Sequence, residues 1–146
     1  MSKVKILKKK AENLWKQVVL LRDGKFCWVQ RFCPEINIIH TKTIQLDHTI
    51  SRKNKHLFLD PKNGIPICSA CNMAKGFGNK SINRAIDNLS KQRDPKWFEW
   101  AVSLDKTCSP NVNFSRVWWL EEQIERLEKE LDELKKGGSH GYGGDQ

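Results

Sequence analysis

The sequence predicts an α+β protein, with a small central region of strands and loops between helical flanks. Apolar residues recur with the period of a helix near the N-terminus and again from residue 81 onward. The stretch between them is rich in β-branched residues, as in the string INIIHTKTIQL, and in turn residues. Four of the five cysteines also fall in this central stretch. We therefore expect a core at residues 25–80, between a basic N-terminal helix at 1–24 and a helical region at 81–136.

The N-terminal segment is predicted to form an amphipathic helix over residues 6–22. Gly24 is suited to end it, because glycine readily takes the left-handed conformation that often follows a helix. The apolar positions of this helix are Leu7, Ala11, Leu14, Trp15, Val18 and Leu21.

The central region is predicted to contain short strands and loops over residues 25–46. A polar, basic loop follows at 49–64 and closes at the turn dipeptide Asn63-Gly64. Residues 65–67 (IPI) form a short apolar strand in this interpretation, and a helix is expected to begin near Ser69.

The C-terminal region is predicted to contain helices at 81–92 and 95–104, the second capped by Asp94 with Pro95 at its first position. A last helix is expected at 115–136. Its apolar residues alternate in spacing between three and four, which is typical of a coiled coil. They are Val117, Leu120, Ile124, Leu127, Leu131 and Leu134.

This spacing allows two interpretations: a homodimer seam, or a single helix packed on its own domain. The dimer is favoured because the outer positions are dense in Glu and Lys. The Gly-rich tail at 137–146 is predicted to be disordered.

The charge of the chain is strongly positive and unevenly distributed. The formal net charge is +9, and residues 1–120 hold 22 Lys and Arg against 9 Asp and Glu. Such an excess favours a polyanion partner, nucleic acid first, although an ordinary basic protein remains an alternative. No run of 18 or more apolar residues occurs, and the N-terminus lacks the apolar stretch of a secretory signal. We therefore expect no membrane contact and a cytoplasmic location.

The cysteines predict one structural zinc site. Cys68 and Cys71 form the CxxC pair, and Cys27 and Cys33 form a second pair with a wider gap. In a reducing compartment, two converging pairs favour a tetrahedral thiolate site over disulfides. His40 is an alternative ligand in place of one cysteine. Cys108 lies outside both pairs and has no expected role.

Three polar residues near the cysteines predict a catalytic site. Asp47-His48 lies between the pairs, and Asn72 directly follows Cys71. A neutral histidine can act as a base near pH 7, whereas carboxylate and amide oxygens suit Mg²⁺. Asp47 and His48 are adjacent, so they could act on one phosphate only if the chain bends sharply there. Each residue alone also fits a structural role, such as a helix start at Asn72 or a turn at Asn63.

The string CWVQRFC…LDH…DPKNGIPICSACNMAKG resembles the motif of HNH (ββα-metal) endonucleases, and it looks closest to phage recombination nucleases of the endonuclease VII and NinG (Rap) types. The resemblance covers about residues 12–80. It implies a ββα-metal core with a zinc knuckle, His48 as general base, and one Mg²⁺ or Mn²⁺ held by Asp47 and Asn72. Asn63 would brace the loop that holds His48. The implied products carry a 5′-phosphate and a 3′-hydroxyl. The implied zinc ligands are Cys27, Cys33, Cys68 and Cys71.

Basic side chains near these residues are candidates for phosphate contacts, which position nucleic acid without reading its sequence. They are Arg52, Lys53, Lys55, Lys75 and Lys80, with Lys8, Lys9 and Lys10 on the first helix. The leading hypothesis from the sequence is a DNA endonuclease that acts as a dimer on branched recombination intermediates such as Holliday junctions. The alternatives are an HNH nicking or homing enzyme for ordinary duplex, and a non-catalytic zinc-ribbon DNA-binding module.

Overall fold

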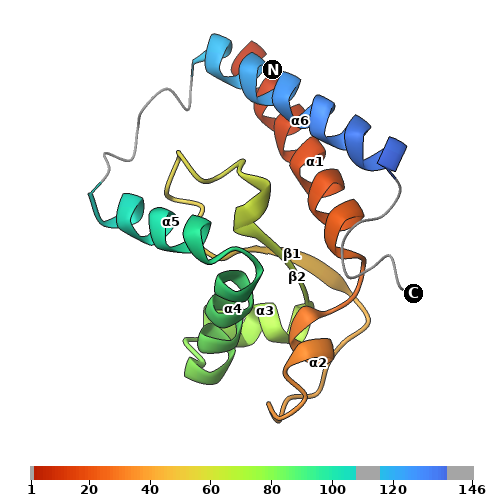
Figure 1. The fold of residues 1–146 in the computed structure, drawn as a ribbon, viewed down its shortest axis with the longest axis vertical. Coiled ribbons are helices and arrows are strands. Elements are labelled where there is room, and N and C mark those ends of the chain that lie inside the picture. Colours follow the sequence, from red (N-terminus) through yellow and green to blue (C-terminus); the bar gives the residue numbers. More distant parts are fainter. Residues whose placement is uncertain (1, 108–115, 138–146) are drawn as a thin grey trace.

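The computed structural model describes residues 2–107 and 116–137. A short β-hairpin lies in the middle of the molecule with helices around it, so the predicted α+β class is confirmed (Figure 1). Cys108 and residues 138–146 of the predicted disordered tail lie outside the described residues. In chain order the elements are α1 (Lys3–Asp23), α2 (Trp28–Phe32), β1 (Ile44–His48), η1 (Pro61–Asn63), β2 (Gly64–Cys68), α3 (Ser69–Gly76), α4 (Lys80–Arg93), α5 (Pro95–Thr107) and α6 (Val117–Gly137).

Helix α1 begins and ends as its sequence dictates. The Ser2 hydroxyl accepts a hydrogen bond from the Lys5 backbone at its start, and Gly24 stops it with a φ of 85°. The helix is therefore slightly longer than the predicted 6–22. Its buried face repeats every three or four residues and includes Ala11, Leu14, Trp15, Val18 and Val19.

Helix α6 lies beside α1, and the two share one hydrophobic cluster (Figure 1). Five of the six heptad residues of α6 belong to this cluster, and Val117 does not. This packing fits the alternative of a helix packed on its own domain, and the homodimer stays a prediction. The buried heptad residues are Leu120, Ile124, Leu127 and Leu131.

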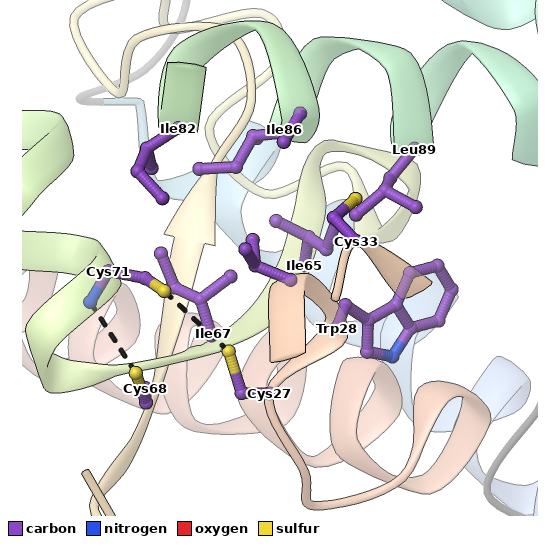
Figure 2. Close-up of a cluster of buried hydrophobic side chains, with 12 residues drawn as sticks. Cys27, Trp28, Cys33, Ile65, Ile67, Cys68, Cys71, Ile82, Ile86 and Leu89 are labelled. Carbon is purple, nitrogen blue, oxygen red and sulfur yellow. Dashed lines mark hydrogen bonds between the residues drawn. The ribbon is translucent and has the colours of Figure 1, made fainter. Parts of the chain in front are cut away.

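The hairpin is antiparallel, with Ile44 opposite Cys68 at one end and His48 opposite Gly64 at the other. A two-stranded sheet needs outside support, which comes from different helices at its two ends. At the Cys68 end, β2 packs with α2, α3 and α4 in a second cluster (Figure 2). At the Gly64 end, β2 meets α1 so closely that a Cβ on Gly64 would lie 2.7 Å from the Trp15 and Val19 side chains.

Residues 25–43 differ from the prediction of strands and loops, because they contain the five-residue helix α2. The predicted strand at 65–67 and the helix after it are confirmed as β2 and α3. Helices α4 and α5 extend the predicted 81–92 and 95–104 by a few residues. Asp94 caps α5, since its carboxylate accepts from the Trp97 backbone at 3.0 Å. Within the described ranges, no helix has the length and apolar character needed to cross a membrane.

Candidate metal centre and active site

Four donor atoms from three segments of the chain converge beside the hairpin. They are the Sγ atoms of Cys27, Cys68 and Cys71 and a ring nitrogen of His40, all within 4.8 Å of one another. Cys27 precedes α2 and Cys68 precedes α3, so each stands at a helix start, and Cys71 lies in the first turn of α3. Figure 2 shows the three cysteine sulfurs turned toward one another.

Cys33 does not join this group, contrary to the prediction. Its side chain packs in the hydrophobic cluster near Ile65 and Leu89, away from the other sulfurs (Figure 2). His40 takes the fourth place instead, as the alternative from the sequence had it. The reason is local: Cys33 ends α2, and the chain then returns along residues 34–43 to bring His40 to Cys68 and Cys71.

The spacing of the four donors fits a zinc ion. With Zn–S near 2.3 Å and Zn–N near 2.0–2.1 Å, a tetrahedral site requires donors about 3.6–3.8 Å apart. The Cys27 sulfur lies 3.8 Å from both the Cys71 sulfur and His40 Nδ1, which matches this range. His40 Nδ1 lies 3.3 Å from the Cys68 sulfur and 3.4 Å from that of Cys71, a few tenths of an ångström shorter. A Cys₃His cluster of this size could bind a zinc ion, and with four protein ligands it would be a closed, structural site.

The electrostatics of the cluster favour a cation. Burial opposes ionisation of Cys68, but hydrogen bonds from the backbone of Thr41 and Cys71 lower the pKa of its thiol to about 6. Burial and the neighbouring sulfurs of Cys27 and Cys68 raise the pKa of Cys71. Buried thiols this close hinder one another's ionisation, and a divalent cation among them would relieve that cost because it binds thiolates.

His48, the last residue of β1, is held on three sides. Its ring stacks on Trp15 with a centroid distance of 4.4 Å and an interplanar angle of 2°, and on Phe58 at 5.1 Å and 6°. Its Nε2 donates to the Phe58 carbonyl oxygen at 3.0 Å. Because a carbonyl only accepts, Nε2 carries the proton in the neutral ring and Nδ1 carries the lone pair.

The surroundings of His48 keep the imidazole neutral. Burial lowers its pKa to about 4, and the positive charges of Arg52 and Lys75 act in the same direction. The Phe58 carbonyl opposes this shift without reversing it. At pH 7 the ring is therefore an unprotonated base.

Asp47 lies on the other side of β1, toward α3. Its carboxylate forms an ion pair with the Lys75 ammonium, which also donates to the His48 carbonyl oxygen at 2.8 Å. Burial raises the pKa of Asp47, while Lys75 opposes the shift. The strand stays regular through His48, so the sharp bend that would bring both side chains to one side is not present. Asp47 and His48 face opposite sides of β1.

Asn72 faces β1 from helix α3. Its amide nitrogen donates to Gln45 Oε1 at 2.6 Å, and Gln45 alternates with Asp47 on the α3 side of the strand. Asn72 and Asp47 are therefore placed toward the same side of the sheet, with the amide oxygen of Asn72 free of any hydrogen-bond partner among the described residues.

A pocket of about 500 Å³ connects the two sides of β1. It runs along the free edge of the strand, and its wall includes His48 and Asn72 but not Asp47. The pocket thus brings together two of the three predicted catalytic residues. The remaining lining residues are Glu12, Trp15, Lys16, Leu20, Ile44, Gln45, Leu46 and Arg52.

Asn63 is fully buried and ties down the loop that follows His48. Its side-chain oxygen accepts from the Ile50 backbone at 2.7 Å, and its amide nitrogen donates to the carbonyls of Ile50 and Leu57. Thr49 bonds the Asn63 carbonyl through its own backbone nitrogen. Through these hydrogen bonds Asn63 braces the loop that follows His48.

The predicted phosphate-binding residues have different surroundings. Arg52 lines the pocket, with its guanidinium 5.0 Å from the Phe58 ring centroid. The Lys55 ammonium lies 5.6 Å from the same ring. Lys53 and Lys80 are exposed. The Lys75 ammonium is paired with the Asp47 carboxylate and donates to the His48 carbonyl. It is therefore less available for a contact with phosphate than the exposed Lys53 and Lys80.

Sequence reasoning missed the residues that hold His48 in place. Trp15 looked like one more apolar position of the first helix, and Phe58 lay in a loop expected to be polar. Arg22 and Asp23 lie at the end of the first predicted helix and had no expected role. In the structure Asp23 is buried between Arg22 and Arg93, with contacts of 2.6 and 2.8 Å. Apart from the adjacent Arg22 and Asp23, these partners lie 10 to 70 residues apart, so no local sequence signal marks their contacts.

In comparisons with protein-family models, curated proteins and solved structures, nothing matches this chain.

Proposed function

We propose that this chain is a metal-dependent DNA endonuclease of the HNH type, with His48 as the general base. The single observation that carries the proposal is the setting of the His48 ring. Nε2 is committed to the Phe58 carbonyl, burial keeps the ring neutral, and the residue lines a pocket at the edge of β1. Nδ1 has no hydrogen-bond partner among the described residues, so its lone pair is available to take a proton from water.

The α3 side of β1 supplies the oxygen ligands that a hard cation requires. Asp47 offers a buried carboxylate and Asn72 an amide oxygen, the ligand types that suit Mg²⁺ or Mn²⁺. A cation there would share Asp47 with the Lys75 ammonium. When bound, it would stabilise negative charge on the phosphate and the leaving oxygen. His48 and Asn72 both line the pocket, so a phosphate bound there would meet the base and the cation without the sharp bend that the sequence seemed to require.

The charge around the pocket fits a nucleic-acid backbone. Lys16 and Arg52 are both in the wall that contains His48. On α1, the exposed Lys5, Lys9 and Lys16 follow one another at intervals of four and seven residues, which places them on one stripe of the helix. This stripe leads toward the pocket. Such contacts position a backbone without selecting a sequence, which suits a structure-selective enzyme acting on branched DNA.

The test is cleavage of a four-way junction, a nicked duplex and a linear duplex by the zinc-loaded protein, with Mg²⁺ either added or omitted. We expect Mg²⁺-dependent cleavage that falls by about 10²–10⁴ in His48→Ala, the range for loss of a general base. DNA binding by that variant should persist. His56→Ala is the matched control, because His56 is a partly buried histidine of the same loop that does not line the pocket.

The outcomes separate the candidate functions. Cleavage confined to the junction supports a recombination nuclease, whereas equal cleavage of the linear duplex supports a nicking or homing enzyme. DNA binding without any Mg²⁺- or Mn²⁺-dependent cleavage would leave the zinc-ribbon binding module and overturn the enzyme.

A further inference from the structure

We infer that Trp15, on the N-terminal helix, is a positioning residue that fixes the plane of the His48 imidazole. The inference rests on the proposed function, because it concerns how the base of that reaction is aimed. It assigns to α1 a role in the active site, in addition to its role in packing against α6.

The geometry leaves the His48 ring almost no freedom. The imidazole stacks on Trp15 at a centroid distance of 4.4 Å and an angle of 2°, and on Phe58 at 5.1 Å and 6°. Two parallel neighbours prevent the ring from tilting. The bond from Nε2 to the Phe58 carbonyl then prevents it from turning within its own plane. The direction of the Nδ1 lone pair follows from these contacts together.

The Trp15 indole is itself held rigidly, so it can fix the orientation of the ring that stacks on it. Its indole is 3% exposed, and its Nε1 donates to the Asp60 carbonyl at 2.9 Å. Gly64, which stands opposite His48 in the hairpin, has no Cβ and so lets the strand approach the indole directly. Helix, strand and loop thus clamp the indole at the position where it meets the imidazole.

A purely structural role for Trp15 is the competing explanation, and the chain contains a matched control for it. Trp97 on α5 is also buried, at 8% exposure, and its Nε1 donates at 2.9 Å to the Asp60 carboxylate. Trp97 belongs to another hydrophobic cluster and does not line the pocket. Replacing it removes an indole and a hydrogen bond to the same residue while leaving the His48 stack intact.

The experiment compares Trp15→Leu, Trp15→Phe and Trp97→Leu in the zinc-loaded protein at a temperature where all three are folded. Single-turnover cleavage gives the rate of the chemical step, and titration with the uncleaved DNA gives affinity. We expect Trp15→Leu to lose about 10²-fold in rate, the cost of a misplaced reacting group, with affinity unchanged. Trp15→Phe should recover most of the rate, because it restores an aromatic face. Trp97→Leu should cut at the wild-type rate.

The same variants give a readout that does not depend on cleavage. The carbon-bound ring protons of His48 should be shifted upfield in the NMR spectrum by the two stacked rings. That shift should decrease in Trp15→Leu and stay in Trp97→Leu. The inference is overturned if Trp15→Leu cuts as fast as Trp97→Leu, or if its His48 resonances do not move. If the wild type shows no His48-dependent cleavage, the proposed function itself fails and the inference falls with it.

Discussion

The two ends of the β1–β2 hairpin are held by different physical means. At the end where Ile44 faces Cys68, four donor atoms that could hold a metal ion lie within 4.8 Å of one another. At the end where His48 faces Gly64, stacked rings, the Asn63 bonds and a buried charge cluster at Asp23 hold the chain. One end therefore has a cluster that could bind a metal ion, whereas the other is held by packing and hydrogen bonds. We therefore expect a substitution at one end to weaken that end while leaving the contacts at the other end in place.

The largest expected effect is at the metal end. A structural zinc site contributes roughly 10–16 kcal/mol of apparent binding free energy at pH 7, so its removal should unfold the region around α2 and α3. We expect His40→Ala to lose zinc and helical circular dichroism, and chelation of the wild type to do the same. Cys33→Ala is the matched control, because Cys33 is a buried cysteine outside the cluster.

Zinc content measured on both variants decides the ligand set. Cys33→Ala should retain one zinc per chain, with only the modest loss of stability expected for a trimmed core side chain. Loss of zinc in Cys33→Ala together with its retention in His40→Ala would restore the four-cysteine site predicted from the sequence.

The next effect in size is at the His48 end. Asp23 is 2% exposed and accepts from both Arg22 and Arg93, and Arg22 also donates to the carbonyls of Pro61 and Gly64. Asp23→Ala would leave two guanidinium groups without their counter-charge. Burial and the nearby Arg22 already lower the pKa of Arg93 to about 10.

We expect Asp23→Ala to lower the free energy of unfolding by about 3–5 kcal/mol, the range for breaking a buried ion pair. Lys62→Ala, which breaks the exposed pair with Asp94, should cost no more than about 1 kcal/mol. Urea denaturation monitored by tryptophan fluorescence measures both. Zinc content should remain unchanged in Asp23→Ala. Equal losses in the two variants would show that the buried cluster is not what holds this end.

The same contrast explains how much of the molecule the sequence predicts. Helices α1, α4 and α5 and the strand β2 follow from local signals such as periodicity, caps and the Gly24 stop, which act over a few residues. Helix α2 was missed because five residues are too few to show a helical period. The heptad of α6 shows that one face is buried, but it cannot say whether the partner is α1 or a second chain.

The candidate site divides in a similar way. The CxxC pair and the Asp47-His48 dipeptide are visible as short motifs, so their residue types could be predicted. The choice between Cys33 and His40 could not, because it depends on how residues 34–43 fold back onto α3. The stack around His48 was equally hidden, since Trp15 reaches it from 33 residues away. Short motifs reveal the residue types of the site, whereas contacts between distant segments set the orientation of each side chain.

The smallest expected effect tests which end of the hairpin would contact DNA if the proposed function holds. Lys16 and Arg52 line the pocket at the His48 end, and the exposed Lys25 and Lys42 flank Cys27 and His40 at the metal end. Each phosphate contact adds about 0.9 to the slope of log affinity against log salt for duplex DNA. In a His48→Ala background, which prevents cleavage, changing both Lys16 and Arg52 to Gln should reduce that slope by about 1.8.

Changing both Lys25 and Lys42 to Gln should leave the slope unchanged. In the proposed function the metal end stabilises the fold and makes no contact with phosphates. Fluorescence anisotropy with a labelled duplex at several salt concentrations measures both pairs, which remove the same charge. An equal reduction by the Lys25 and Lys42 pair would mean that the DNA backbone also crosses the metal end. The division of the hairpin into a structural end and a substrate end would then be wrong, even if the metal cluster and the His48 pocket have the geometry described above.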